Sequence, residues 1–299
     1  MAKPTRVEGL SAQTPLAEAA RLLTAARLAD ARRYVELVER DCDEVEAVHD
    51  LRVATRRLRA ALGLCGPVLD GEEREAKRLQ DALGAVRDAQ LQIAWLGEAL
   101  LSATEPLGCR PRQRDALAAL IEHRQDDLRH AEKRLLEALR RWRETEPRLL
   151  GALETLDRKG KLGGHRVRAR LRRRLKALRK RMRDADASLR ADVAHALRIA
   201  VKKLRYDAEL VQPALPEQLA AVLEAVEPLQ ELLGNVHDAD VRLEFLEEAA
   251  ARWPDTRDGL EGLQISELTR RGQLAHELAG RLAQWRDDDK ARQLRALFR

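Results

Sequence analysis

Hydrophobic residues recur at helical spacing along nearly the whole chain, whereas the alternating pattern typical of β-strands is nearly absent. Leucine and alanine form narrow apolar stripes, and charged residues fill the positions between them. Proline and glycine interrupt the pattern at a few places, at Gly66-Pro67, Glu105 to Pro111, Pro213, Pro216 and Pro254. The pattern predicts helices near 14–43, 45–65, 72–103, 111–145, 165–189, 191–212, 216–252 and 256–297.

The second half of the chain resembles the first. "VHDLR" at 48–52 aligns with "AHALR" at 194–198, and "RRLR" at 56–59 aligns with "KKLR" at 202–205. "LQDALGAVRDAQL" at 79–91 likewise aligns with "LQELLGNVHDADV" at 229–241. We interpret the chain as an internal duplication, with its joint near "LDRKGKLGGH". The predicted fold is all-α: one domain, 14–297, made of two antiparallel four-helix bundles, 14–150 and 160–297, with a pseudo-two-fold relation.

The charge is unevenly distributed. Lys and Arg number 56 against 50 Asp and Glu, a net charge of +6 that suggests an anionic partner without proving one. Residues 166–183 hold eleven Arg or Lys and no acid. One flank of this predicted helix carries a candidate secondary binding stripe of Arg172, Lys176, Arg179 and Arg183. The modest net charge therefore conceals strong local electrostatic fields.

The two copies of the histidine motif place their charges alike. On a helix, His49, Arg52, Arg56 and Arg59 share one quadrant opposite Leu51 and Leu58, while Arg57 stands apart. Like-charge neighbours of this kind each cost roughly 0.2–0.5 kcal/mol in an isolated helix. The favourable interaction that offsets this repulsion must come from another helix or from a ligand. The second copy repeats the arrangement with His195, Arg198, Lys202 and Arg205, and Tyr206 lies beside its basic stripe.

These motifs resemble those of the CHAD family, the conserved-histidine α-helical domain. The resemblance rests on "VHDLRVATRRLR", its copy "AHALRIAVKKLRY", and the paired "LGAVRDAQ" and "LGNVHDAD" segments, and it extends over about 14–297. It implies a basic central groove or pore that binds inorganic polyphosphate, often at polyphosphate granules. Family members often follow a triphosphate-tunnel domain. None precedes this copy, so we expect a stand-alone binding protein.

Carried onto this sequence, the resemblance implies a polyphosphate site divided between the halves. Its residues would be His49, Arg52, Arg56, Arg57, Arg59, His195, Arg198, Lys202, Lys203, Arg205 and Tyr206. Arg87 and His237, which occupy matching positions, would be secondary ligands. The copies differ at two aligned positions: Ala60 in the first corresponds to Tyr206 in the second, and Arg87 corresponds to His237. A histidine is mostly neutral above pH 7, so the halves could bind with unequal strength there.

Three other functions remain open. Glu46 and His49, like Asp192 and His195, have the spacing of a di-metal carboxylate bundle, but the neighbouring arginines would repel a cation. Nucleic-acid binding through backbone charge would use the same stripe, although the chain has only 3% aromatic residues for stacking bases. A protein-interaction scaffold is the third. We expect no catalytic residues, metal or cofactor, and the oligomeric state stays open.

The compartment follows from cysteines and hydropathy. Cys42, Cys65 and Cys109 form no CxxC pair, which is typical of thiols in a reducing cytosol. The N-terminus has no apolar signal core, and no stretch of about 18 uncharged apolar residues occurs that could span a membrane. We therefore expect a cytoplasmic protein, bound at polyphosphate granules, with no membrane partner.

Overall fold

The protein is described by a computed structural model that covers residues 4–104, 111–185 and 189–298. Within these ranges the regular elements are helices, and the β-type pairing is a single bridge between Pro15 and Lys161. The predicted all-α fold is therefore confirmed. Cys109 and the Glu105-Pro106 break lie outside the described residues.

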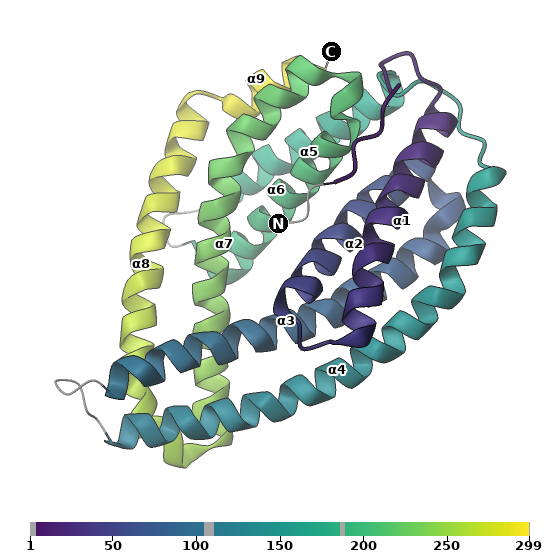
Figure 1. Cartoon of the computed structure of the whole chain (residues 1–299). Coiled ribbons are helices and arrows are strands. Elements are labelled where there is room, and N and C mark those ends of the chain that lie inside the picture. The colour runs from purple at the N-terminus through teal and green to yellow at the C-terminus, as the bar shows by residue number, and fades with distance from the viewer. Residues whose placement is uncertain (1–3, 105–110, 186–188, 299) are drawn as a thin grey trace.

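The first half of the chain contains four long helices that contact one another in order around a shared core (Figure 1). They are α1 (Leu16–Arg40), α2 (Val45–Cys65), α3 (Asp70–Thr104) and α4 (Pro111–Glu154). A short 3-10 turn, Pro67–Leu69, follows α2, and α4 returns to contact α1. Gly66 ends α2 with a positive φ of 80°, a conformation that a residue without a Cβ adopts readily.

The long helices of the second half also contact one another in chain order. Its helices are α5 (His165–Asp184), α6 (Ala191–Val211), α7 (Pro216–Arg252), α8 (Arg257–Asp287) and the short α9 (Lys290–Ala296). The 3-10 turns Gln212–Ala214 and Pro254–Thr256 join α6 to α7 and α7 to α8. α9 packs on α5. The internal duplication and its pseudo-two-fold relation stay predictions.

Helix boundaries differ from those expected at several places. α1 ends at Arg40 rather than at 43, and α5 ends at Asp184 rather than at 189. α4 continues past Pro147 to Glu154, and the buried Leu149 and Leu153 extend its apolar face there. Packing of these side chains therefore outweighs the proline's missing N–H. The single helix expected over 256–297 is divided, because Asp289 takes a left-handed φ of 41° between α8 and α9.

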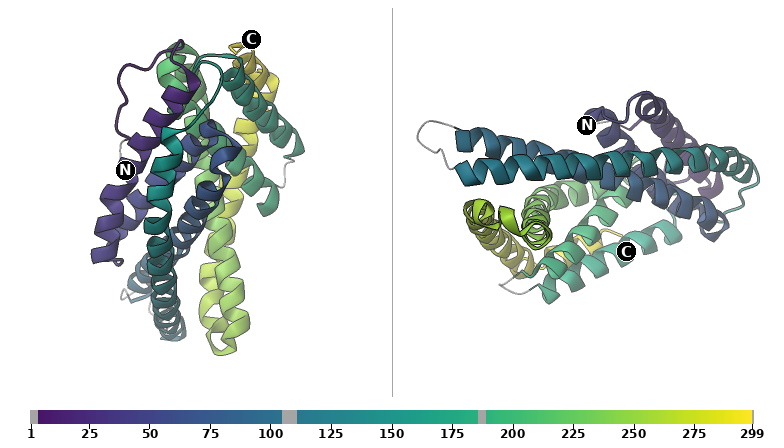
Figure 2. Two further views of the ribbon diagram at one scale, coloured as in Figure 1. Left: turned by 90° about the vertical axis from the view of Figure 1, so that its right-hand side faces the viewer. Right: turned by 90° about the horizontal axis from the view of Figure 1, so that it is seen from below.

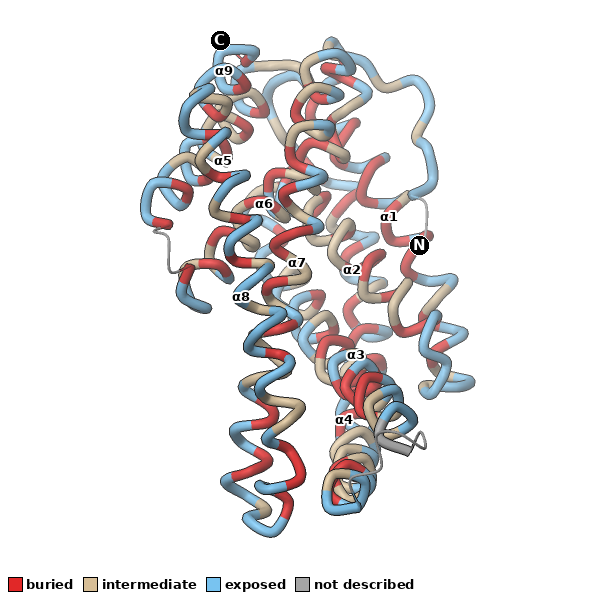
Figure 3. Tube along the Cα trace, turned by 90° about the vertical axis from the view of Figure 1, so that its left-hand side faces the viewer, coloured by how far each residue is buried: buried red, intermediate tan, exposed pale blue. Residues whose placement is uncertain are grey.

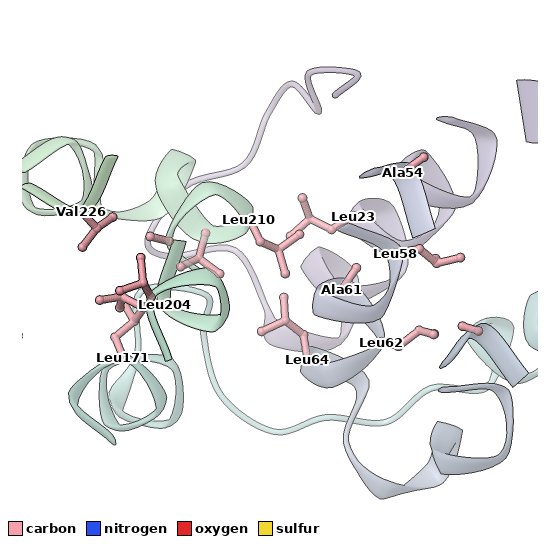
Figure 4. Packing of buried hydrophobic residues seen from close by; sticks show 14 of the residues in the cluster. Leu23, Ala54, Leu58, Ala61, Leu62, Leu64, Leu171, Leu204, Leu210 and Val226 are labelled. Atoms are coloured by element: carbon pink, nitrogen blue, oxygen red, sulfur yellow. The ribbon is translucent and has the colours of Figure 1, made fainter. Parts of the chain in front are cut away.

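The described parts of the two halves touch at several places, which include the bridge between Pro15 and Lys161 and two junctions between helices. Near one end α2 packs against α6, and Figure 4 shows Leu23, Leu64 and Leu210 between the two halves. At the other end the α3–α4 pair reaches the far ends of α7 and α8 (Figures 1 and 2). A second apolar cluster, separate from the main core, fills this distal junction: Trp95, Leu96, Ala116, Leu117, Leu120, Phe245, Leu246, Ala249 and Leu260.

Each helix has one buried and one exposed side, as the alternation of colours along α7 and α8 in Figure 3 shows. This is the arrangement that narrow apolar stripes produce. Among the described residues, no helix combines the length and apolarity that crossing a membrane requires.

Candidate functional site

The histidine motifs lie on the two helices that meet between the halves. The apolar sides of α2 and α6 are buried within their own halves, with Leu51 and Leu58 at most 1% exposed and Leu197 and Leu204 at 0%. Because the basic residues occupy other sides of the same helices, burying the leucines leaves them free to meet between α2 and α6.

Four cationic side chains, two from each helix, lie close enough for their charges to interact. We call Arg52, Arg56, Arg198 and Lys202 the cationic cluster; all four are half-buried. Burial, reinforced by the charges of Arg56, Arg198 and Arg52, lowers the pKa of Lys202 to about 6. The Lys202 side chain is therefore mostly a neutral amine at pH 7 in the ligand-free protein, because burial and the neighbouring charges both disfavour the ammonium form.

Two arginines of the cluster, Arg52 and Arg198, do not have all their hydrogen-bond donors satisfied. Burial and the nearby Arg56 lower the pKa of Arg52 to about 10, although Asp88 of α3 lies 3.7 Å from its Nη2 atom. Burial also lowers the pKa of Arg198, against the opposing effect of Asp238. In the described structure the Nε atoms of Arg52 and Arg198 are both buried without a hydrogen-bond partner. An anion between the helices would supply acceptors for both.

Two histidines lie beside the cluster in the second half. The rings of His195 and His237 are 5.2 Å apart, centre to centre. Burial, together with the charges of Arg198 and His195, lowers the pKa of His237 to about 3. His237 is therefore neutral over the whole physiological range. The expected inequality between the two halves above pH 7 stays a prediction, and His237 is already uncharged at neutral pH in the ligand-free protein.

In the first half, His49 and Arg87 take the corresponding places. Burial, followed by the charge of Arg87, lowers the pKa of His49. Arg87 donates to the carbonyl of Val45 at 3.4 Å, near the start of α2. Tyr206 of α6 influences the pKa of both Arg52 and Arg198, less than burial does, so it too lies near the cluster.

Other predicted ligands are engaged elsewhere. Arg59 donates to Glu73 and Gln80 of α3, at 2.8 and 3.0 Å. Arg57 and Arg205 both approach Glu209: Arg57 Nε is 3.6 Å from its Oε2 atom, and Arg205 Nε is 2.8 Å from its Oε1 atom. These contacts hold α2 against α3 and α6.

The remaining predicted ligands are not linked to the cluster by the described contacts. Lys203 is exposed on α6. On α5, Arg179 forms an ion pair with Asp289 at 3.1 Å, while Arg172 is half-buried and Lys176 and Arg183 are exposed. Because Asp289 precedes α9, this stripe includes a contact toward the C-terminal end of the fold.

Three acidic residues of this region were missed as site components. Asp88 and Asp238 occupy matching places in the repeated segments, so the repeat itself carries the signal that could have identified them. The third, Asp207, is 4% exposed and accepts hydrogen bonds from Arg170 and Arg174 of α5. It has no equivalent in the quoted motifs and could not be paired from sequence.

The metal-ligating side chains that cluster in the described residues are Cys42, Asp43 and Glu132, whose ligand atoms all lie within 4.8 Å of one another. Neither motif histidine belongs to this group. Burial, then a hydrogen bond with Asp43, raises the pKa of Glu132 to about 7. Protonation of Glu132 allows a hydrogen bond with Asp43 and relieves the repulsion between the two carboxyl groups.

This raised pKa predicts a pH-dependent effect of Glu132→Gln. The unfolded carboxyl ionises near pH 4.3, so its contribution to stability is present below that pH and is lost as the pH rises through about 7. Glutamine keeps a neutral donor toward Asp43. We expect the variant to have a higher Tm than the parent at pH 8 and little difference at pH 4. Glu137→Gln, at an exposed position on the same helix, is the control and should shift neither value.

Comparisons with known proteins agree with this architecture. A family model described as "CHAD domain" matches residues 22–247. The crystal structure of the CHAD domain from Ricinus communis is 24% identical, with a TM-score of 0.64, covering 100% of this chain and 97% of that one. PptA from Streptomyces chartreusis is 18% identical, with a TM-score of 0.63, covering 91% and 100% respectively. No curated protein matches the chain. With the family model spanning most of its length, the chain belongs to the CHAD domain family.

Proposed function

We propose that this protein binds inorganic polyphosphate between α2 and α6, without catalysing a reaction on it. The observation that carries the proposal is the cationic cluster, in which two helices from different halves bring Arg52, Arg56, Arg198 and Lys202 together. The family is associated with polyphosphate binding, which agrees with this chemistry. The two halves would be the two four-helix bundles of a duplicated unit, with the basic groove between them.

The chemistry of the cluster suits a chain of phosphates. Guanidinium groups donate in a planar fork that matches phosphate oxygens, and polyphosphate carries a charge at every unit. Single-stranded nucleic acid would instead favour aromatic surfaces on which bases stack. Apart from the histidines, the aromatic side chain that we find near the cluster is Tyr206. A base-independent polyanion therefore fits better than a nucleic acid.

Competition between ligands tests the proposal. We expect long-chain polyphosphate to bind and to displace bound DNA and RNA. Its affinity should fall as salt rises from low to physiological concentration, since binding releases counterions. Orthophosphate at the same phosphate concentration should compete poorly. DNA that binds equally or more tightly in the same buffer would favour nucleic acid. Iron, manganese or zinc that remains at stoichiometric level after dialysis would favour the di-metal alternative.

The cellular setting follows from the ligand. A protein that binds polyphosphate without consuming it can associate with polyphosphate granules in the cytoplasm, and we propose this location. Fluorescently tagged protein should gather at granules in polyphosphate-containing cells and spread evenly in cells unable to make the polymer. Granule recruitment that survives loss of polyphosphate would instead indicate a protein partner, as the scaffold alternative predicts.

A further inference from the structure

A separate basic pocket lies at the end of α2 that is far from His49, next to the start of α5. This end pocket has a volume of about 510 Å³, and its lining includes four arginines, one histidine and no acid. The cationic lining residues are Arg158, His165, Arg166, Arg170 and Arg173. None of them belongs to the cationic cluster or to the α5 stripe formed by Arg172, Lys176, Arg179 and Arg183.

Two of these arginines are held in place by the end of α2. Arg170 donates to the carbonyl of Gly63, and Arg158 Nε donates to the carbonyl of Leu64 at 3.3 Å. Terminal helix carbonyls lack partners within their own helix, so these contacts satisfy them. Glycine leaves room for this contact, because a Cβ at position 63 would lie 2.7 Å from the Arg170 guanidinium nitrogens and would shift that side chain. Arg170 is further fixed by Asp207.

The other cations come from the start of α5. His165, Arg166 and Arg173 are all exposed, and the helical repeat places them on one side of α5. α5 begins at His165 with no side-chain cap and no acid in its first turn. Its helix dipole therefore adds positive potential beside the pocket rather than being neutralised.

We propose that the end pocket is a second anion site, which binds phosphate groups independently of the cationic cluster. Arg158 and Arg170 form its fixed wall, while Arg166 and Arg173 close over the ligand. Its relation to the first site rests on the proposed function: Gly63 lies seven residues beyond Arg56, or about 10 Å along α2. A long polyphosphate could occupy both sites, and the second contact would then raise the overall affinity by its effective concentration.

Tripolyphosphate tests the pocket directly, because the cluster can be disabled first. In a background of Arg56→Glu with Lys202→Glu, we expect weak tripolyphosphate binding to persist by calorimetry at low salt. Adding Arg166→Glu with Arg173→Glu should lower this residual affinity at least tenfold. The matched control is Arg140→Glu with Arg141→Glu, at two exposed positions on α4 that give the same change in net charge. Equal losses of affinity in the pocket variant and the control, or no loss in either, would overturn the proposal that the end pocket binds phosphate groups.

Long-chain polyphosphate tests the relation between the sites in the otherwise unchanged protein. Arg166→Glu with Arg173→Glu should weaken long-chain binding about tenfold, while the α4 control changes it by less than twofold. If the reversed pair unfolds the protein, as shown by lost helical circular dichroism, Arg166→Gln with Arg173→Gln gives the same test with a smaller charge change. If the cluster variant does not weaken binding, the proposed function is wrong. The tripolyphosphate experiment still tests whether the end pocket binds phosphate groups.

Discussion

Arg56→Glu combined with Lys202→Glu is expected to weaken polyphosphate binding by about 100-fold or more, because each change removes a charge-assisted contact of about 1.5–3 kcal/mol and adds a repelling carboxylate. The dependence of affinity on salt should also flatten, since fewer phosphates are neutralised on binding. Glutamate is a good helix former, so α2 and α6 should persist. A binding titration at two salt concentrations measures both effects.

The control for this variant is Lys133→Glu with Arg140→Glu, which reverses one lysine and one arginine at exposed positions on α4. It should leave affinity within about twofold, the scatter expected of a surface change. Thermal unfolding provides an independent readout. The cluster variant should have an equal or higher Tm than the parent without ligand, because repulsion between α2 and α6 is relieved. Unchanged polyphosphate affinity in a folded cluster variant would show that the site lies elsewhere.

Polyphosphate affinity is expected to fall as the pH rises from 7 to 9, by up to about tenfold per pH unit, with uptake of one proton by Lys202. In the ligand-free protein burial and three arginines lower the pKa of Lys202 to about 6. A bound polyanion favours the ammonium form and raises that pKa. Binding therefore requires protonation at any pH above about 6, and the cost increases with pH. Calorimetry in buffers of different ionisation enthalpy counts the protons taken up.

Lys202→Arg separates this effect from titration of the ligand's own phosphates. A guanidinium stays protonated throughout the range, so the variant should bind with a shallower pH dependence than the parent. Two other strongly shifted groups lie beside Lys202. His237, with a pKa of about 3, is neutral from pH 7 to 9 in the ligand-free protein, and Arg52, with a pKa of about 10, is mostly protonated there. The charge of Asp238 opposes the lowering of the Lys202 pKa. Identical pH profiles for the parent and Lys202→Arg would contradict the assignment.

Much of the fold could be predicted because each helix carries its own pattern. The apolar positions of α2 and α6 recur at helical spacing, and prolines such as Pro213 and Pro216 mark the joints. The end of α4 could not be predicted, since it depends on how Leu149 and Leu153 pack against other helices. The same holds for the break at Asp289, where a single residue takes a left-handed conformation.

The candidate site was predictable only as far as helix geometry extends. A helical projection correctly separates the charged quadrant from Leu51 and Leu58, but it cannot distinguish Arg56 from Arg59. Their difference comes from α3, where Glu73 and Gln80 bind Arg59. Likewise, nothing in the local sequence shows that Arg170 and Arg174 meet Asp207 of the next helix. Interactions between helices decide which cations remain available for a ligand.

The two junctions between the halves explain how mutually repelling side chains can be kept together in the absence of a ligand. Leu23, Leu64 and Leu210 hold α2 near α6 at one end, and the Trp95–Phe245 cluster joins the halves at the other. Contacts at both ends resist rotation about either one. Burial of apolar surface during folding thus supports the electrostatic strain of the cluster. A polyanion that binds there, as we propose, would meet a preorganised site and lose little conformational entropy on binding.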